Sequence, residues 1–216
     1  MSDKIKLDII SDVVCPWCMI SYNHLQAAIE DLNLQDRVEI KWLPFELNSE
    51  MPAEGEELRS HLARKYGSSK ADSARTLATI KQAGADYGFD FEYFDEMKMV
   101  NTLDAHLLLD YAHQVGKQTK LKMRLFSAFF TEQKDISNRN VLLNEAAAIG
   151  ISIEQSQVAL VDDDIRNRVQ TLKSQWQKMG ISGVPTIIFN GKIALTGAQP
   201  QSTFKEVLLE LIEQKK

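Results

Sequence analysis

IKLDIISDVVCPWC, residues 5–18, is the stretch that decides the fold. Residues 5–10 are mostly apolar and predict a strand, and Cys15 and Cys18, the two cysteines of the chain, follow where a helix is expected to begin. Pro16 suits the first helical position, because the backbone N–H that proline lacks has no partner there. At a helix N-terminus, unpaired N–H groups favour a thiolate over a thiol at Cys15. The spacing therefore predicts a redox-active dithiol.

Further strands are predicted at both ends of the chain. Residues 38–43 alternate with period two and indicate a second strand after the first helix. Near the C-terminus, residues 186–189 and 192–195 flank an Asn-Gly pair, which suits a tight hairpin turn, and a last helix is expected over about 200–214. These strands can share one sheet only if both ends of the chain build the same domain.

The middle of the chain predicts helices. From about residue 56 to residue 179 apolar residues recur with helical spacing, and we find no convincing strand. We therefore assign residues 1–55 and 180–216 to one discontinuous domain and residues 56–179 to a helical insertion whose last helix returns to the core. The insertion contains a basic group that we interpret as a solvated helix face: Lys117, Lys120, Lys122 and Arg124.

The composition of the chain limits the choice of cellular compartment and of binding partners. The chain has 216 residues, 44% hydrophobic and 25% charged, as in soluble globular proteins, and its net charge of −5 argues against binding nucleic acid or a membrane. We find neither a signal peptide nor a membrane-length apolar run, so the default is cytoplasmic, where a structural disulfide is not expected. One CxxC without a second cysteine pair does not suggest zinc. We predict no metal, and no cofactor beyond a redox-active Cys15–Cys18 disulfide.

A second motif, SGVPT at residues 182–186, comes directly before the predicted hairpin. Taken alone, a proline there is explained as a residue at a strand edge. However, a strand, a CxxC helix and a strand, followed by this motif, a hairpin and a helix, have the order of the thioredoxin fold. In that fold the Val184–Pro185 bond is typically cis and packs against the CxxC.

The chain resembles the FrnE-like branch of the DsbA family of thioredoxin-fold oxidoreductases over nearly its whole length. The motifs that carry this resemblance are SDVVCPWC (11–18), NTLDAH (101–106), LF and FFTE (125–126 and 129–132), DIS (135–137) and GISGVP (180–185). The resemblance implies an α/β, thioredoxin-like fold with a large inserted all-helical domain. It also implies that Cys15 is the nucleophile, Cys18 the resolving thiol and Pro185 the cis proline. Residues 19–22 (MISY) differ from the residues expected after CPWC. The resemblance therefore does not extend to the local packing and substrate choice at these positions.

Five further residues are predicted to contact substrate. Pro16 and Trp17 lie between the cysteines, and the Val184 backbone is expected to present hydrogen bonds to an extended substrate strand. The resemblance implies that Asn101 and Thr102 face the cleft. The alternative for these two residues is an N-cap at the start of a helix.

Two other groups of polar residues remain open. Asp8 and Asp12 compete as a buried proton acceptor near the dithiol, and the sequence does not decide between them. His106 and His113 are seven residues apart on one helical face. We interpret them as partly buried histidines with satisfied hydrogen bonds rather than as ligands or catalytic groups.

The predicted function is that of a cytoplasmic thiol–disulfide oxidoreductase that forms a mixed disulfide through its CPWC dithiol. Its partners would be protein or peptide thiols and disulfides, with glutathione or a small molecule as further candidates; oxidase, reductase and isomerase directions remain open. One alternative is a glutathione-dependent isomerase or transferase of the kappa-class type, although those relatives typically have serine in place of the first cysteine. A non-catalytic peptide-binding module is the other.

Overall fold

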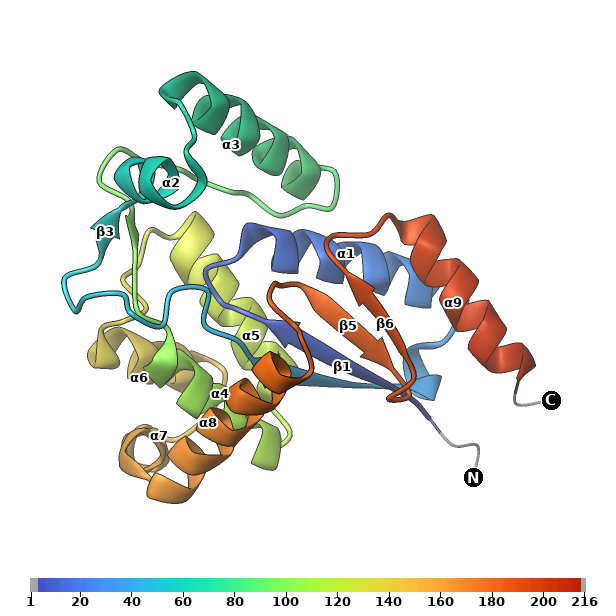
Figure 1. The fold of residues 1–216 in the computed structure, drawn as a ribbon. Helices are drawn as coiled ribbons and strands as arrows, with labels where there is room; N and C mark the ends of the chain where they lie inside the picture. The colour runs from blue at the N-terminus through green and yellow to red at the C-terminus, as the bar shows by residue number, and fades with distance from the viewer. Residues whose placement is uncertain (1–3, 215–216) are drawn as a thin grey trace.

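A mixed sheet of four strands forms the centre of the structure, a computed structural model that describes residues 4–214 (Figure 1). The strands lie in the order β2–β1–β5–β6. β1 (Ile5–Ser11) runs parallel to β2 (Val38–Pro44) and antiparallel to β5 (Thr186–Phe189), which forms a hairpin with β6 (Ile193–Thr196). The two ends of the chain thus build one sheet, and the predicted strands are confirmed.

The hairpin turn and the central strand have the features that their sequences predict. Asn190 and Gly191 both have positive φ, 49° and 67°, as a tight primed turn requires. In β1, Leu7 and Ile9 are at most 1% exposed. Ile9 lies opposite Trp42 of β2 on one side and Ile187 of β5 on the other. A strand that pairs on both sides and is buried in this way has a mostly apolar sequence, and that is the pattern that predicts β1.

Two helices built from the ends of the chain pack against each other (Figure 1). α1 (Pro16–Asp31) follows the CxxC start, and α9 (Gln201–Glu213) closes the chain. α9 buries Phe204, Leu208 and Leu211, whose spacing of three and four places them on one face. The fold class is confirmed as α/β and thioredoxin-like.

The segment between β2 and β5 is mainly helical. Its helices are α2 (Leu58–Tyr66), α3 (Lys70–Ala85), α4 (Leu103–Gln114), α5 (Gln118–Phe126), α6 (Arg139–Ala148), α7 (Ile153–Val161) and α8 (Asp163–Lys178), with a π-helical turn η2 (Ser127–Thr131) after α5. A 3-10 turn, η1 (Gln35–Arg37), precedes β2. The domain boundaries at 55/56 and 179/180 stay a prediction, and no helix in residues 4–214 is both long and apolar enough to cross a membrane.

The prediction that this segment lacks strands is wrong. β3 (Glu56–Glu57) and β4 (Lys98–Met99) form a separate antiparallel pair. Each strand has only two residues, so neither can show the alternation by which a strand is recognised in a sequence. The pair joins the start of α2 to the chain just before α4.

α5 and α8 both contact β2. On α8, Trp176 packs with Ile10 and Leu43 of the sheet. On α5, Gln118 accepts a hydrogen bond from the backbone N–H of Trp42 at 2.9 Å and donates one to the Trp42 carbonyl at 2.8 Å. The side chain of Gln118 therefore occupies the place that a neighbouring strand would take beside Trp42.

Candidate active site

Cys15 occupies the N-cap position of α1, and Pro16 the first helical position. The Cys15 N–H donates to the Asp12 carbonyl at 3.3 Å, and the Cys15 carbonyl accepts from the Cys18 N–H at 3.1 Å. Both cysteines are free thiols; Cys15 is 3% exposed and Cys18 is fully buried. The expected start of the helix at the CxxC is confirmed, and the Cys15 side chain stands at the N-terminal end of the helix dipole without making a cap hydrogen bond.

The Val184–Pro185 segment lies against this helix start. The Cys15 thiol lies 3.9 Å from the Val184 carbonyl oxygen, although the two residues are 169 positions apart in the chain. The Val184–Pro185 peptide bond is cis, as the resemblance implies. β5 begins at the next residue, Thr186. The sheet thereby brings the two ends of the chain together at the first cysteine.

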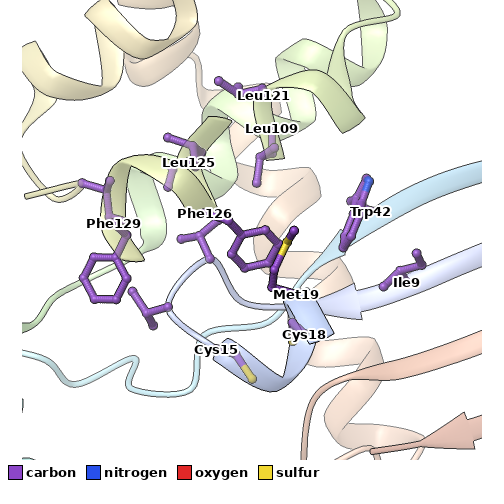
Figure 2. Close-up of a cluster of buried hydrophobic side chains, with 14 of the residues drawn as sticks. Ile9, Cys15, Cys18, Met19, Trp42, Leu109, Leu121, Leu125, Phe126 and Phe129 are labelled. Carbon is purple, nitrogen blue, oxygen red and sulfur yellow. The ribbon is translucent and has the colours of Figure 1, made fainter. Parts of the chain in front are cut away.

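Cys18 faces the interior. Figure 2 shows it at the lower end of a buried cluster in which Met19 lies close to Phe126 of α5. Burial raises the pKa of the Cys18 thiol well above its ordinary value, and a hydrogen bond to the Cys15 sulfur and the charge of Cys15 raise it further. Cys18 is therefore the thiol that keeps its proton when Cys15 is ionised.

Of Asp8 and Asp12, only Asp12 is fully buried beside the dithiol turn, and a role as proton acceptor stays a prediction. Asp8 is partly exposed in β1, and burial raises its pKa. Asp12 is fully buried directly before the CxxC turn, and its carboxylate accepts the Leu47 N–H at 2.8 Å. His106 Nε2 lies 3.3 Å from the other Asp12 oxygen and 3.0 Å from the Phe45 carbonyl. Because both neighbours accept hydrogen bonds, Nε2 carries the proton.

The contacts of Asp12 keep it ionised. Burial alone would raise its pKa, but the hydrogen bond and charge of His106, together with the Leu47 N–H and the charge of Lys122, hold the pKa of this carboxyl below its ordinary value. A negative charge therefore lies inside the protein beside the dithiol turn. The Nε2 of His106 has hydrogen-bond partners, as the sequence interpretation expects, and the side chain is buried. His113 is exposed, so the prediction that it is partly buried is wrong.

Lys122 does not belong to a solvated face, and that prediction is wrong. It is 0% exposed, its Nζ lies 5.3 Å from the ring centre of Trp42 and 5.0 Å from that of Phe126, and it has no hydrogen-bond partner among residues 4–214. Burial lowers the pKa of Lys122 to about 8, although the charges of Cys18 and Asp12 raise it. Contact with two aromatic faces is the stabilisation that the buried ammonium group retains.

A cavity of about 400 Å³ borders the first cysteine. Cys15, Pro16, Trp17 and Val184 lie along it, facing residues of α2, α3 and η2. Trp17 is 36% exposed, which is high for a large aromatic side chain in this fold. The cavity thus brings together three of the residues predicted to contact substrate.

Asn101 and Thr102 are not among the residues that line this cavity. The Asn101 side chain accepts the backbone N–H of Leu103 at 2.9 Å, and Thr102, at the N-cap position of α4, is buried and makes no side-chain cap bond. Asn101 therefore supplies the cap that was the alternative for this pair, and substrate contact by either residue stays a prediction.

Two residues of α2, His61 and Lys65, lie near Cys15 and are not predicted from the sequence. His61 of α2 is buried and lines the cavity, with its Nδ1 2.7 Å from a Glu56 oxygen. Lys65, also on α2, donates to the Leu47 carbonyl and the Asn48 side chain, both at 2.7 Å. Burial lowers the pKa of Lys65, and the charges of Asp12 and Cys15 oppose that change. No local pattern indicates either residue, because only the docking of α2 brings them close.

The described residues offer no evident site for a metal. Within residues 4–214, no three His, Cys, Asp or Glu side chains are grouped as metal ligands would be.

Comparison with known proteins places this site in a family. A family model described as DSBA-like thioredoxin domain matches residues 6–209. YwbO of Bacillus subtilis (strain 168) is 25% identical over 213 residues, 98% of either chain. The crystal structure of the probable DsbA oxidoreductase SCO1869 from Streptomyces coelicolor has a TM-score of 0.88 at 23% identity, covering 95% of this chain and 89% of that one. The cytosolic disulfide reductase DsbM from Pseudomonas aeruginosa, solved with GSH, has a TM-score of 0.63 at 16% identity, covering 96% and 99%.

These similarities confirm the predicted family and the fold, while the FrnE-like branch stays a prediction. Because the family model spans nearly the whole chain, this protein belongs to the DSBA-like thioredoxin domain family.

Proposed function

We propose that this protein exchanges disulfides with protein or peptide substrates through Cys15 and Cys18. The observation that carries the proposal is the unequal placement of the two sulfurs. Cys15 stands at a helix N-terminus beside a cavity and beside Val184, whereas Cys18 is enclosed one turn further on. A nucleophile that meets substrate and a second thiol that meets only the first are the two parts that this exchange needs.

The exchange runs in two balanced steps. The Cys15 thiolate attacks one sulfur of a substrate disulfide, forms a mixed disulfide and releases the other sulfur as a thiolate. Cys18 then gives its proton to the substrate thiolate released in the first step and attacks the Cys15 sulfur, which closes the Cys15–Cys18 disulfide and releases the second substrate thiolate. Two electrons pass from the protein dithiol to the substrate, and the same steps in reverse oxidise a substrate dithiol.

The compartment and the reducing partner belong to the same proposal. We place the protein in the cytoplasm, where the glutathione pool would return the Cys15–Cys18 disulfide to the dithiol form. The likeness to DsbM, which is described as a cytosolic disulfide reductase and was solved with GSH, supports this choice. The kappa-class alternative has less support, because the cysteine at position 15 is present.

Trapping of mixed disulfides tests the proposal. A Cys18→Ser protein should accumulate a covalent adduct with a cystine-containing peptide on Cys15, and a Cys15→Ser protein should form almost none, because its remaining thiol is buried and protonated. The wild-type protein should catalyse reduction of the same peptide by glutathione. Non-reducing gels and mass spectrometry give the readout, and the double Cys→Ser protein controls for non-covalent binding. Equal trapping by both single variants, or an inactive wild type, would contradict it.

A further inference from the structure

The cavity beside Cys15 is lined mainly by uncharged side chains. Among its lining residues, all within residues 4–214, there is no lysine, arginine, aspartate or glutamate. Aliphatic, thioether and aromatic side chains from several elements make up most of the wall, among them Leu58, Leu77, Ile80, Met97 and Phe129. A wall of this kind favours the transfer of apolar surface out of water.

We infer that this cavity binds an uncharged, apolar group carried next to the reacting sulfur of the substrate. The inference rests on the proposed function and specifies its substrate class. Cys15 and Val184 form one side of the cavity, so a substrate sulfur in contact with Cys15 places its neighbouring group inside. The volume of about 400 Å³ lies within the range of sites for small molecules, roughly 300–1,000 Å³.

The charged residues near the cavity are held by other partners. Lys65 influences Cys15 by its charge, but its ammonium group bonds to the Leu47 carbonyl and the Asn48 side chain, and Lys65 is not a lining residue. His61 does line the cavity, but Glu56 holds its Nδ1. At most one ring nitrogen of His61 is left for a ligand.

This arrangement disfavours a charged group in the cavity. A carboxylate or an ammonium group that leaves water needs an oppositely charged or strongly hydrogen-bonding partner, and burial without one is costly. Apart from Cys15 and His61, the polar groups of the lining are uncharged: the amide of Asn48 and the hydroxyl groups of Tyr66, Ser68, Ser73, Thr76 and Tyr93. Glutathione carries two carboxylates and an amine, so it reacts at Cys15 more slowly than a thiol with a phenylalanine-sized group, and it serves as the reductant because the glutathione pool is in excess.

Matched disulfides test the substrate class. The reduced protein is mixed with the symmetrical disulfides of acetyl-Phe-Cys-amide and acetyl-Glu-Cys-amide and with glutathione disulfide, and the rate of its oxidation is measured by quenched mass spectrometry. Each rate is divided by that of dithiothreitol with the same disulfide, which removes differences in intrinsic reactivity. The phenylalanine peptide should be favoured over the other two by about tenfold or more, as expected when a large apolar side chain is buried.

A fourth disulfide, that of 2-phenylethanethiol, distinguishes a peptide substrate from a small-molecule thiol as the carrier of the apolar group. It carries the apolar ring without a peptide backbone. If this disulfide oxidises the protein as fast, relative to dithiothreitol, as the phenylalanine peptide does, the apolar group of a small-molecule thiol is sufficient for recognition. If only the peptide reacts faster, the substrate backbone contributes to recognition as well. Either result supports the uncharged cavity, and acceleration of neither overturns it.

Adjacent substitutions on α3 locate the effect. Leu77 lines the cavity, and Ala78 is exposed and does not. Leu77→Lys should reduce the preference for the phenylalanine peptide several-fold and raise the relative rate of the glutamate peptide, while Ala78→Lys should keep the wild-type ratio. Thr76→Lys, at an exposed lining position, provides a second variant if Leu77→Lys fails to fold.

The outcomes distinguish this inference from the proposed function. If the reduced wild type reacts with all the disulfides in proportion to dithiothreitol, the oxidoreductase function stands and the inference about the cavity is overturned. The inference is overturned as well if Leu77→Lys and Thr76→Lys are folded and keep the wild-type ratio. If none of the disulfides oxidises the protein, the proposed function itself fails.

Discussion

The two cysteines are three residues apart in the sequence and have different surroundings. Cys15 adjoins an uncharged cavity, with the Val184 carbonyl as its neighbour. Cys18 is enclosed, and the charges of Lys122 and of the Cys15 sulfur act on it from within the protein. Asp12 and His106 lie on the interior side of the same turn. One thiol is thus surrounded by groups that suit a substrate, and the other by groups that control a proton.

The difference explains how two identical side chains take separate roles. The helix N-terminus acts mainly on Cys15 because its effect falls off within the first turn. Cys18 is one turn further in, where burial keeps the thiol protonated until it is needed. The buried charges of Asp12, His106 and Lys122 come from the residue directly after β1, from α4 and from α5. Substitution of these side chains should therefore affect Cys18 without altering the substrate cavity.

The largest effect is expected from Asp12→Asn, which removes the buried negative charge. The variant leaves His106 and Lys122 without that charge, and we expect a loss of about 3 kcal/mol in the free energy of unfolding at pH 7. The pKa of Asp12 is lower in the folded protein than in the unfolded chain. The contribution of the Asp12 charge to the free energy of unfolding is therefore fully present above the pKa of the unfolded chain, about 4, and disappears as the pH falls through the pKa of the folded protein.

Urea unfolding of the wild type and of Asp12→Asn at several pH values checks this prediction. The difference between the two proteins should be full at pH 7 and should shrink below about pH 4. Asp8→Asn, at a partly exposed position within β1, is the control and should cost much less. A difference that is independent of pH would show that the charge of Asp12 does not matter.

A smaller effect of opposite sign is expected from Lys122→Met. Replacing a buried charge that has no hydrogen bond by an apolar side chain should stabilise the protein by about 2 kcal/mol at pH 7. The pKa of Lys122 falls from 10.5 to about 8 on folding, so the unfolded chain binds the extra proton between these values. The wild type therefore gains stability as the pH rises from about 8 to 10.5, and the advantage of the variant shrinks over that interval.

The same variant should impair the second step of exchange. Without the cation, the pKa of Cys18 rises further, and the mixed disulfide on Cys15 should persist longer. Alkylation of Cys18 against pH in a Cys15→Ser background measures the first effect, and rapid quenching of mixed disulfides measures the second. Lys120→Met, at an exposed position of the same helix, is the control. An unchanged Cys18 titration would limit Lys122 to a packing role.

The smallest effect is expected from Asn101→Ala, because Asn101 belongs neither to the cavity beside Cys15 nor to the buried charges around Cys18. The loss of its hydrogen bond to the Leu103 N–H should reduce the free energy of unfolding by about 1 kcal/mol, as for other helix caps. The rate of thiol exchange should stay at the wild-type value, because Asn101 does not line the cavity. A stable variant with slower exchange would instead favour the substrate contact that the family resemblance implies.

The sequence predicts the parts of this molecule that depend on local pattern. The apolar run of β1, the Asn-Gly turn and the two cysteines at a helix start are all visible in short segments, and the order of the elements indicates the fold. The buried charges are not visible in this way. In the sequence Lys122 stands among other basic residues, which in the structure are partly or fully exposed. Only the broad buried face of α5 reveals its position: Gln118, Leu121, Lys122, Leu125 and Phe126.

The cavity is unpredictable from the sequence for a related reason. Its walls come from the CxxC turn, α2, α3, η2 and the segment before β5, which are separated by long stretches of chain. His61 and Lys65 have ordinary helical neighbours and acquire their surroundings only when α2 docks. Local propensity does not contain that information, because it arises from tertiary packing.

The two hydrogen bonds between Gln118 and Trp42 also bear on the solubility of the chain. β2 is the outer strand of the sheet beside β1, and an outer strand presents unpaired backbone groups with which another polypeptide can pair. At Trp42 both backbone groups are already bonded to the amide of Gln118, and α5 lies against the strand. A second molecule could extend the sheet at this edge only by breaking those bonds and displacing α5. The helix that carries Lys122 thus also protects the protein from edge-to-edge aggregation.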